Sequence, residues 1–190
     1  MDDQTDIHRL ADALIANGRD LEAELEWLAQ LLQRRLAENF AEPSKSPALP
    51  GPKTPPPALD GGHSPYARFV LQHHLAPPER AVLLLALAPH LRPQLLDVLW
   101  TRNEATQRGF SEFGGLQGVA QGAFLPTGET AAFLLAGDDL AARLAAACLL
   151  GPDQKLSRLD VLQLAGTPYN ESALAGGLQV SRRFLGLVTR

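Results

Sequence analysis

Residues 76–88 read APPERAVLLLALA, and this stretch decides the fold. Pro78 suits the first turn of a helix, because the proline nitrogen has no proton to leave unpaired there. From Ala81 to Ala88 every residue is apolar, and a helix that is apolar on all sides is stable when other elements cover it. We therefore expect a central buried helix that ends at Pro89.

Helix-start and helix-stop residues place further helices on both sides of this segment. Pro65 is a good first-turn residue. The Thr127 hydroxyl can accept a hydrogen bond from a first-turn amide, and Asp138 is expected to cap the helix that follows. Gly137 suits the helix end between them. We expect helices over residues 65–72, 91–100, 128–136 and 139–150, and a last one opened by Ser181 over residues 182–188.

Two regions downstream are expected to leave the helical pattern. Residues 109–122 are rich in glycine, which predicts a loop or a short hairpin. Residues 156–164 and 173–180 alternate or carry small residues, which predicts a two-stranded β element. The expected fold class is therefore mainly α with a small β element, that is, α+β.

The first forty residues carry a one-sided apolar stripe. Ile and Leu recur at three- and four-residue steps among Arg, Asp and Glu, which predicts an amphipathic helical arm. Gly18 either interrupts one helix or separates two. The stripe either joins a partner or a second copy, or it packs on the core of its own chain. The candidate contact residues on it are Leu21, Leu25, Leu28 and Leu32.

Residues 41–64 change character, because seven prolines stand there among Ser, Lys, Gly and Asp. Such a stretch predicts an extended, semi-rigid spacer rather than a packed element. The expected organisation is an arm over residues 1–40, a Pro-rich linker over 41–64 and a helical domain over 65–190. The arm is then tethered to the domain and free to move relative to it.

Charge and composition limit the kinds of partner and the cellular compartment that we expect for this protein. The net charge of −4 provides no positive field to attract phosphate backbones, which argues against a nucleic-acid partner. The apolar stretches are far shorter than the ~20 residues that cross a bilayer, and the acidic N-terminus does not read as a secretory signal. Cys148, the one cysteine, lies in an Ala/Leu run that predicts a buried helix face. We expect a cytoplasmic protein without a membrane partner.

Two motifs carry a resemblance to a known family. Residues 108–115 read RGFSEFGG, and residues 122–140 read GAFLPTGETAAFLLAGDDL. They resemble the region N-terminal to the ATPase module in AAA-family ATPases of bacterial contractile injection systems, and the resemblance covers residues 65–190. It implies a winged-helix-like N-terminal domain of a hexamer-forming ATPase that serves a phage-tail-like particle. ATP and magnesium are then implied for an ATPase module outside this sequence.

No stretch of the sequence has the chemistry of a phosphate-binding loop. Such a loop needs a glycine-rich turn, a lysine that reaches the phosphates and an adjacent Ser or Thr for magnesium. Residues 122–130 come nearest, but the two glycines are one residue too far apart and Glu129 stands where the lysine should be. We therefore expect no cofactor in this chain and interpret Thr127 to Glu129 as a helix start.

The sequence also contains only weak candidates for metal ligands and for a catalytic nucleophile. His73 and His74 are adjacent, so on a helix they point about 100° apart and do not grip one metal, even if His90 approaches. Cys148 lacks a neighbouring histidine, and Asp138 and Asp139 are explained by helix capping. We expect no catalytic, cofactor-binding or metal-binding residue.

The sequence thus favours a non-catalytic interaction domain that mediates subunit or partner contacts. Its partners are expected to be proteins, either other copies of itself or components of the injection particle. Phe110 and Phe113, flanked by glycines, are the candidate contact residues in the glycine-rich region, with core filling as the alternative. A nucleic-acid-binding winged-helix-like adaptor and an enzyme with an unrecognised site are the alternative functions.

Overall fold

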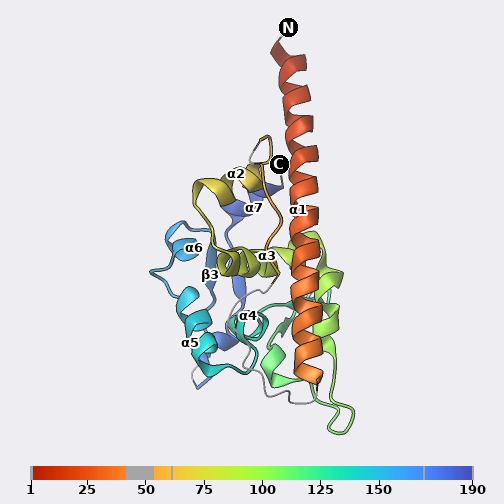
Figure 1. Ribbon diagram of the computed structural model, residues 1–190, viewed down its shortest axis with the longest axis vertical. Helices are drawn as coiled ribbons and strands as arrows, with labels where there is room; N and C mark the ends of the chain where they lie inside the picture. Colours follow the sequence, from red (N-terminus) through yellow and green to blue (C-terminus); the bar gives the residue numbers. More distant parts are fainter. Residues whose placement is uncertain (1, 42–53, 61, 169, 190) are drawn as a thin grey trace.

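The computed structural model describes residues 2–41, 54–60, 62–168 and 170–189 (Figure 1). It confirms the predicted fold class, since it is mainly helical with two small two-stranded sheets. The α-helices are α1 (Asp2–Phe40), α2 (Pro65–Gln72), α3 (Pro77–Leu91), α4 (Gly128–Ala136), α5 (Leu140–Leu149), α6 (Lys155–Arg158) and α7 (Arg182–Val188). The 3-10 helices are η1 (Pro93–Trp100), η2 (Ser111–Phe113) and η3 (Ala173–Ala175), and the strands are β1 (Leu116–Gln117), β2 (Phe124–Leu125), β3 (Leu162–Leu164) and β4 (Leu178–Val180).

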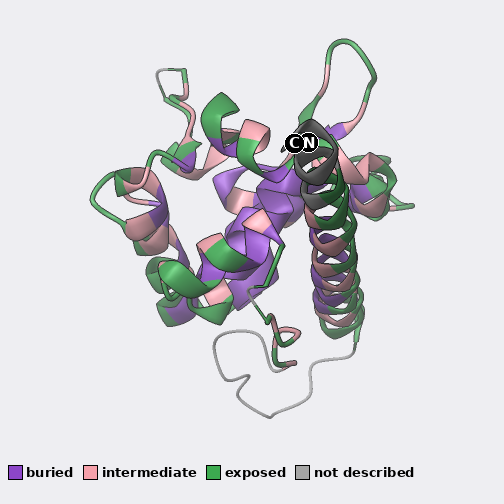
Figure 2. Ribbon diagram, turned by 90° about the horizontal axis from the view of Figure 1, so that it is seen from above, coloured by how far each residue is buried: buried purple, intermediate pink, exposed green. Residues whose placement is uncertain are grey.

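Helix α3 is the central element, as its all-round apolar sequence predicted. Every residue from Glu79 to Ala88 is buried, and the buried residues gather in the middle of the molecule (Figure 2). The predicted end at Pro89 was wrong by two residues. Pro89 lies in the last turn, and the helix still closes there because the Arg92 N–H donates to the Ala88 carbonyl at 2.8 Å. The helix predicted over residues 91–100 is present as the 3-10 helix η1, which begins at Pro93.

Helix α1 is one continuous helix, which settles the question left open by Gly18. A side chain at Gly18 would meet nothing within 4 Å, so the glycine reflects no close approach. The candidate contact residues Leu21, Leu25, Leu28 and Leu32 are not exposed to a partner. All four are buried in the core that α1 shares with the rest of the chain. The alternative, packing on the chain's own core, is the arrangement observed. The N-terminal part of α1 extends beyond the body (Figure 1).

Part of the predicted linker is held against this core. The Trp27 indole N–H donates to the Thr54 carbonyl at 2.9 Å, and the Arg80 guanidinium donates to the Pro57 carbonyl at 2.9 Å. Leu59 packs against the core. The expected free spacer therefore does not describe residues 54–60, because these contacts fix them to α1 and α3. Residues 42–53 and 61 lie outside the described residues.

A buried polar network joins α1 to α2 and α3. Glu24 is fully buried; its carboxylate accepts a hydrogen bond from the Tyr66 hydroxyl at 2.9 Å and pairs with Arg80. The Arg80 guanidinium also lies over the Trp27 ring, 5.8 Å from its centroid. Burial raises the pKa of Tyr66, which keeps the phenol protonated as the donor. The network thus joins the three helices through one buried carboxylate, which is both paired with a cation and hydrogen-bonded, as burial of a charge requires.

Asn17 forms a second buried junction, at the point where α1 passes α2 and α7. Its side-chain oxygen accepts from the Ser64 hydroxyl at 3.1 Å and from the Tyr66 N–H at 3.0 Å. Its amide nitrogen donates to the Val188 carbonyl at 2.6 Å. One side chain thus ties α1 to both α2 and the end of α7.

Both predicted β regions form sheets, but the prediction of β structure over residues 156–164 and 173–180 was wrong for the first part of each segment. There the structure has the helices α6 and η3 instead. Strands β1 and β2 pair antiparallel within the glycine-rich region and its edge. Strand β3 pairs antiparallel with β4, with Leu162 opposite Val180 and Leu164 opposite Leu178. The other edge of the β4 segment meets the chain before α4, where Leu178 N–H donates to the Pro126 carbonyl at 2.8 Å. The β4 segment therefore lies between β3 and residues 126–127.

The helix caps follow the sequence with one exception. Thr127 accepts from the Thr130 N–H, as predicted, and Ser64 and Ser181 cap α2 and α7 in the same way. The prediction that Asp138 caps α5 was wrong. The capping side chain belongs to Asp139, which accepts from the Ala142 N–H at 2.9 Å, because Asp139 has the extended backbone that an N-cap needs, with φ −70° and ψ 109°.

Replacing Asp139 by alanine should lower the free energy of unfolding by about 1 kcal/mol, because the Ala142 N–H loses its acceptor. The neighbouring Asp138→Ala is the matched control and should change it by less than about 0.5 kcal/mol. Urea denaturation of the two variants measures both values. Equal losses would show that the cap is shared.

Among the described residues, no single helix is both long and apolar enough to cross a membrane.

Candidate interaction surface

Helix α5 presents an apolar face to solvent. Its sequence, LAARLAAACL, turns the small side chains of Ala142 and Ala146 toward the core. The opposite face carries Leu140, which is 71% exposed, and Leu144, which is 62% exposed. Leucines four residues apart lie on the same side of a helix. Two large apolar side chains therefore stand together on the surface, although burial of either would be favourable.

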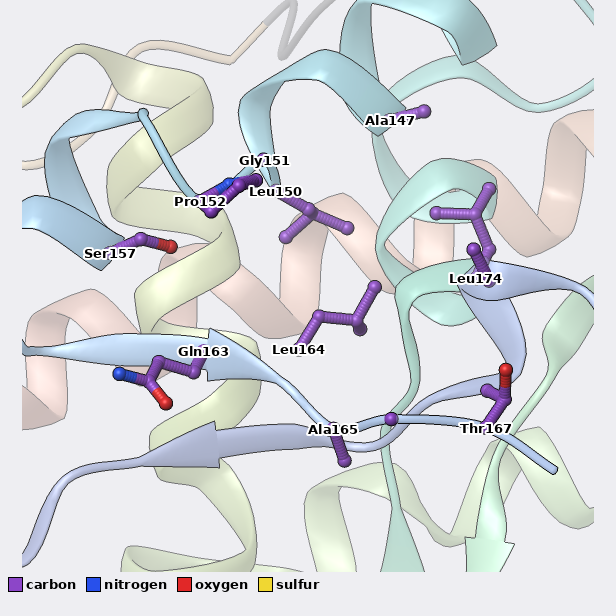
Figure 3. Close-up of a pocket in the computed structure, with 12 residues that line it drawn as sticks. Ala147, Leu150, Gly151, Pro152, Ser157, Gln163, Leu164, Ala165, Thr167 and Leu174 are labelled. Atoms are coloured by element: carbon purple, nitrogen blue, oxygen red, sulfur yellow. The ribbon is translucent and has the colours of Figure 1, made fainter.

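An apolar cleft lies at the end of α5, and Ala147, three residues after Leu144, lines it (Figure 3). Ala147, Leu150 and Pro152 form one wall of the cleft. Leu164 of β3 and Leu174 of η3 form the opposite wall. The cavity is about 680 Å³. We call Leu140, Leu144, Ala147 and this cleft the α5 surface; an apolar patch beside a concave cleft is typical of a protein-binding site.

The charges around α5 are already paired within the chain. Arg143 is the one charged residue of α5. Its guanidinium pairs with Glu129 of α4 and donates to the Gly137 carbonyl at 3.1 Å. The helix therefore offers no free cation to a phosphate, and the α5 surface suits an apolar partner.

The two candidate phenylalanines are placed differently. Phe113 is 1% exposed, and its ring lies 4.7 Å from that of Phe133 in α4. Core filling, the alternative considered for this residue, is what the structure shows. Phe110 packs on the edge of the core, where its ring lies 5.0 Å from Phe113 and 5.2 Å from Phe40. Phe110 is thus partly accessible, beside the 54% exposed Phe40.

Two glycines of the glycine-rich loop stand where a side chain does not fit, and a Cβ at the first of them, Gly114, would lie 2.4 Å from the Thr127 hydroxyl oxygen at the start of α4. Gly115 has a φ of +89°, and a Cβ there would lie 2.2 Å from the Phe124 ring. Its N–H donates to the Thr127 side chain at 3.2 Å. The loop thus closes over the start of α4, where Glu129 pairs with Arg143. Residues 127–129 form the helix start that the sequence predicted.

The histidines considered as metal ligands do not assemble. His73 packs beside Phe69 with its ring tilted by 48° and the ring centroids 4.6 Å apart, and His74 follows it with a left-handed backbone. Burial lowers the pKa of His90 at the end of α3. Within the described ranges, no three His, Cys, Asp or Glu side chains come close enough to hold a metal ion.

Cys148 was expected to be buried, and this was wrong. It is exposed, because it lies on the outward side of α5, a helix whose inward side is filled by Ala142 and Ala146. The Ala/Leu run was interpreted as one buried face, whereas its leucines at positions 140 and 144 lie outside. The four-residue spacing of these leucines, offset from the inward alanines, is the signal that could have located the α5 surface.

Cys148 should react with a maleimide or an aromatic disulfide reagent in the native protein, without denaturant. An exposed thiol reacts at a rate set by its thiolate fraction and its access. Absorbance at neutral pH follows the reaction, and the unfolded protein in urea provides the reference rate. A native rate less than about one hundredth of that reference would place the thiol in the interior.

The chain matches no protein-family model, and neither a curated protein nor a solved structure matches it.

Proposed function

We propose that this chain is a non-catalytic N-terminal interaction domain of an AAA-family ATPase of a contractile injection system, acting in the cytoplasm. The family assignment is supported by the resemblance of residues 108–115 and 122–140 to that family. The ATP and magnesium sites belong to a module outside this sequence, and this domain brings the ATPase to its protein partner.

The order of elements supports a winged-helix-like arrangement of residues 77–190. A helix (α3) is followed by a short extended segment at residues 125–127, then by two helices (α4 and α5) and the β3–β4 hairpin. The β4 segment lies between β3 and the extended segment, as the bridge from Thr127 to Gly177 marks. In this arrangement α5 stands where a DNA-binding member of the class places its recognition helix.

The exposed apolar face of α5 is the observation that carries the proposal. A recognition helix that enters a DNA groove needs cations and hydrogen-bond donors. Here that position carries Leu140 and Leu144, and its arginine is paired with Glu129. Apolar side chains depleted of charge are the composition of a protein-interface core. The α5 surface therefore fits a protein partner, namely a component of the injection particle with a complementary apolar surface.

Binding to the purified contractile particle tests the proposal. The double variant Leu140→Glu/Leu144→Glu should bind immobilised particles about 30-fold more weakly or worse, because charges replace the centre of an apolar interface. Val119→Glu changes an exposed apolar side chain in the glycine-rich loop, away from α5, and is the matched control. Circular dichroism of both variants should match the parent protein.

Two results would contradict the proposal. Absence of particle binding by the parent chain would remove the particle as the partner, and undiminished binding by the double variant would remove the α5 surface. Fluorescence anisotropy with duplex DNA at low salt tests the adaptor alternative. Tight binding that falls with added salt would favour that alternative, since counterion release gives such a dependence.

A further inference from the structure

A second concave site lies between α2, α6 and α7. Its rim carries Arg158 of α6 with Arg182 and Arg183 of α7, and its apolar lining includes Phe69 and Leu187. The cavity is about 720 Å³. We call this site the arginine groove. It is centred on α2 and α7 rather than on α5, although α6 borders both sites, and it differs in charge, since cations border its apolar floor.

The cations of the arginine groove are not neutralised by the described part of the chain. Across the described ranges, no side-chain hydrogen bond or ion pair engages Arg158, Arg182 or Arg183. Asp160 is the acidic residue of the lining, and it accepts from the Gln163 amide at 3.5 Å. Arg182 and Arg183 stand in the first turn of α7, where cations oppose the helix dipole. Helix stability therefore does not explain their placement.

The N-terminal part of α1 has the complementary chemistry. It extends beyond the body (Figure 1), and three of its apolar side chains are uncovered, with Leu10 and Ile15 each 56% exposed and Leu14 44% exposed. The sequence from Asp2 to Asp12 carries four aspartates and one arginine, a formal charge of −3 with histidine neutral. This segment, residues 2–16, is the α1 tip. It combines acidic and apolar residues, as the groove combines basic and apolar ones.

We propose that the α1 tip of one copy occupies the arginine groove of a second copy. Carboxylates of the tip then meet the three arginines, and the leucines cover the apolar floor formed with Phe69 and Leu187. Symmetric pairing of two tips is disfavoured, because it brings two segments of like charge together. The groove offers the tip both opposite charge and apolar area.

This contact is heterologous, since each copy contributes a tip to one neighbour and a groove to another. Contacts of this kind build closed rings when the rotation between copies closes, and open chains when it does not. The inference goes beyond the proposed function, because it concerns a different surface and a different partner. Self-association is measured without the injection particle, so failure here leaves the test of the α5 surface unaffected.

A complementation experiment tests the contact by sedimentation velocity at low salt. The tip variant is Leu10→Lys/Asp12→Lys, and the groove variant is Arg182→Glu/Arg183→Glu; all four residues are exposed. Each variant alone should self-associate at least about tenfold more weakly than the parent. Added salt should also weaken the self-association of the parent, because it screens the charges of the contact. An equimolar mixture of the two variants should recover a dimer, since the tip variant retains a parental groove and the groove variant retains a parental tip.

The matched control is Arg102→Glu/Arg108→Glu, which reverses two exposed arginines outside the groove and should self-associate like the parent. A parent chain that stays monomeric at high micromolar concentration and low salt would overturn the proposal. The proposal would also be overturned if the groove variant self-associated as strongly as the parent. It would be overturned as well if the mixture of tip and groove variants associated no more strongly than either variant alone. Anisotropy with duplex DNA completes the set, because groove-dependent DNA binding with unchanged self-association would assign the groove to nucleic acid instead.

Discussion

Replacing Glu24 by alanine should lower the free energy of unfolding by about 3–5 kcal/mol, because it leaves the Arg80 charge without its buried partner. Glu24 is fully buried, and its carboxylate holds both Arg80 and the Tyr66 hydroxyl. The remaining guanidinium contacts, with the Pro57 carbonyl and the Trp27 ring, do not neutralise the charge. Urea denaturation followed by circular dichroism measures the loss.

The double variant Glu24→Leu/Arg80→Met shows whether Glu24→Ala is destabilised by the unpaired Arg80 charge or by the lost packing of the Glu24 side chain. Removing both charges of a buried pair is often near neutral or stabilising, whereas removing one is not. The double variant should therefore be more stable than Glu24→Ala by about 2 kcal/mol or more. Equal instability of the two would show that cavity formation, rather than the unpaired charge, dominates at this position.

Replacing Phe113 by alanine should cost about 3–5 kcal/mol of stability, the range for a large aromatic side chain removed from a core. Its ring contacts Phe133 on the inside and Phe110 and Phe40 on the outside, so truncation opens a cavity and breaks the link between α1, η2 and α4. Thermal or urea unfolding provides the value.

Phe110→Ala is the matched comparison within the same aromatic cluster. Phe110 is partly buried at the edge of the core, so its loss should cost less than half as much as that of Phe113. If Phe110→Ala instead weakens particle binding while stability is retained, the cluster contributes to the partner contact. Equal destabilisation by the two substitutions would contradict the division into a core ring and an edge ring.

Local sequence signals predicted most of the elements, and the reasons are visible in particular residues. Residues 81–88 are apolar on all sides, so burial was the one stable arrangement for that helix. Thr127 and Ser181 are strong cap residues, and the structure places their side chains at the starts of α4 and α7. Asp138 and Asp139 are equally good cap residues. Nothing local distinguished them, and the wrong one was chosen.

Properties that depend on tertiary packing were harder to predict. The leucine stripe of α1 has the same pattern whether it faces a partner or the chain's own core, and only the fold shows that Leu21 to Leu32 face the core. The Glu24, Tyr66 and Arg80 network joins residues 42 and 56 positions apart, so no motif marked it. The α5 surface was missed because alanine fills both inward and outward positions of that helix, which blurs its amphipathic pattern.

The Asn17 junction has a consequence for the order in which the protein matures during synthesis. The amide nitrogen of Asn17 finds its acceptor at Val188, a residue 171 positions later. A ribosome adds about 5–20 residues per second, so roughly ten seconds or more pass between the synthesis of Asn17 and the synthesis of Val188. Helix α1 can contact α2 and α3 earlier, but its hydrogen bond to the end of α7 forms only after α7 has been synthesised.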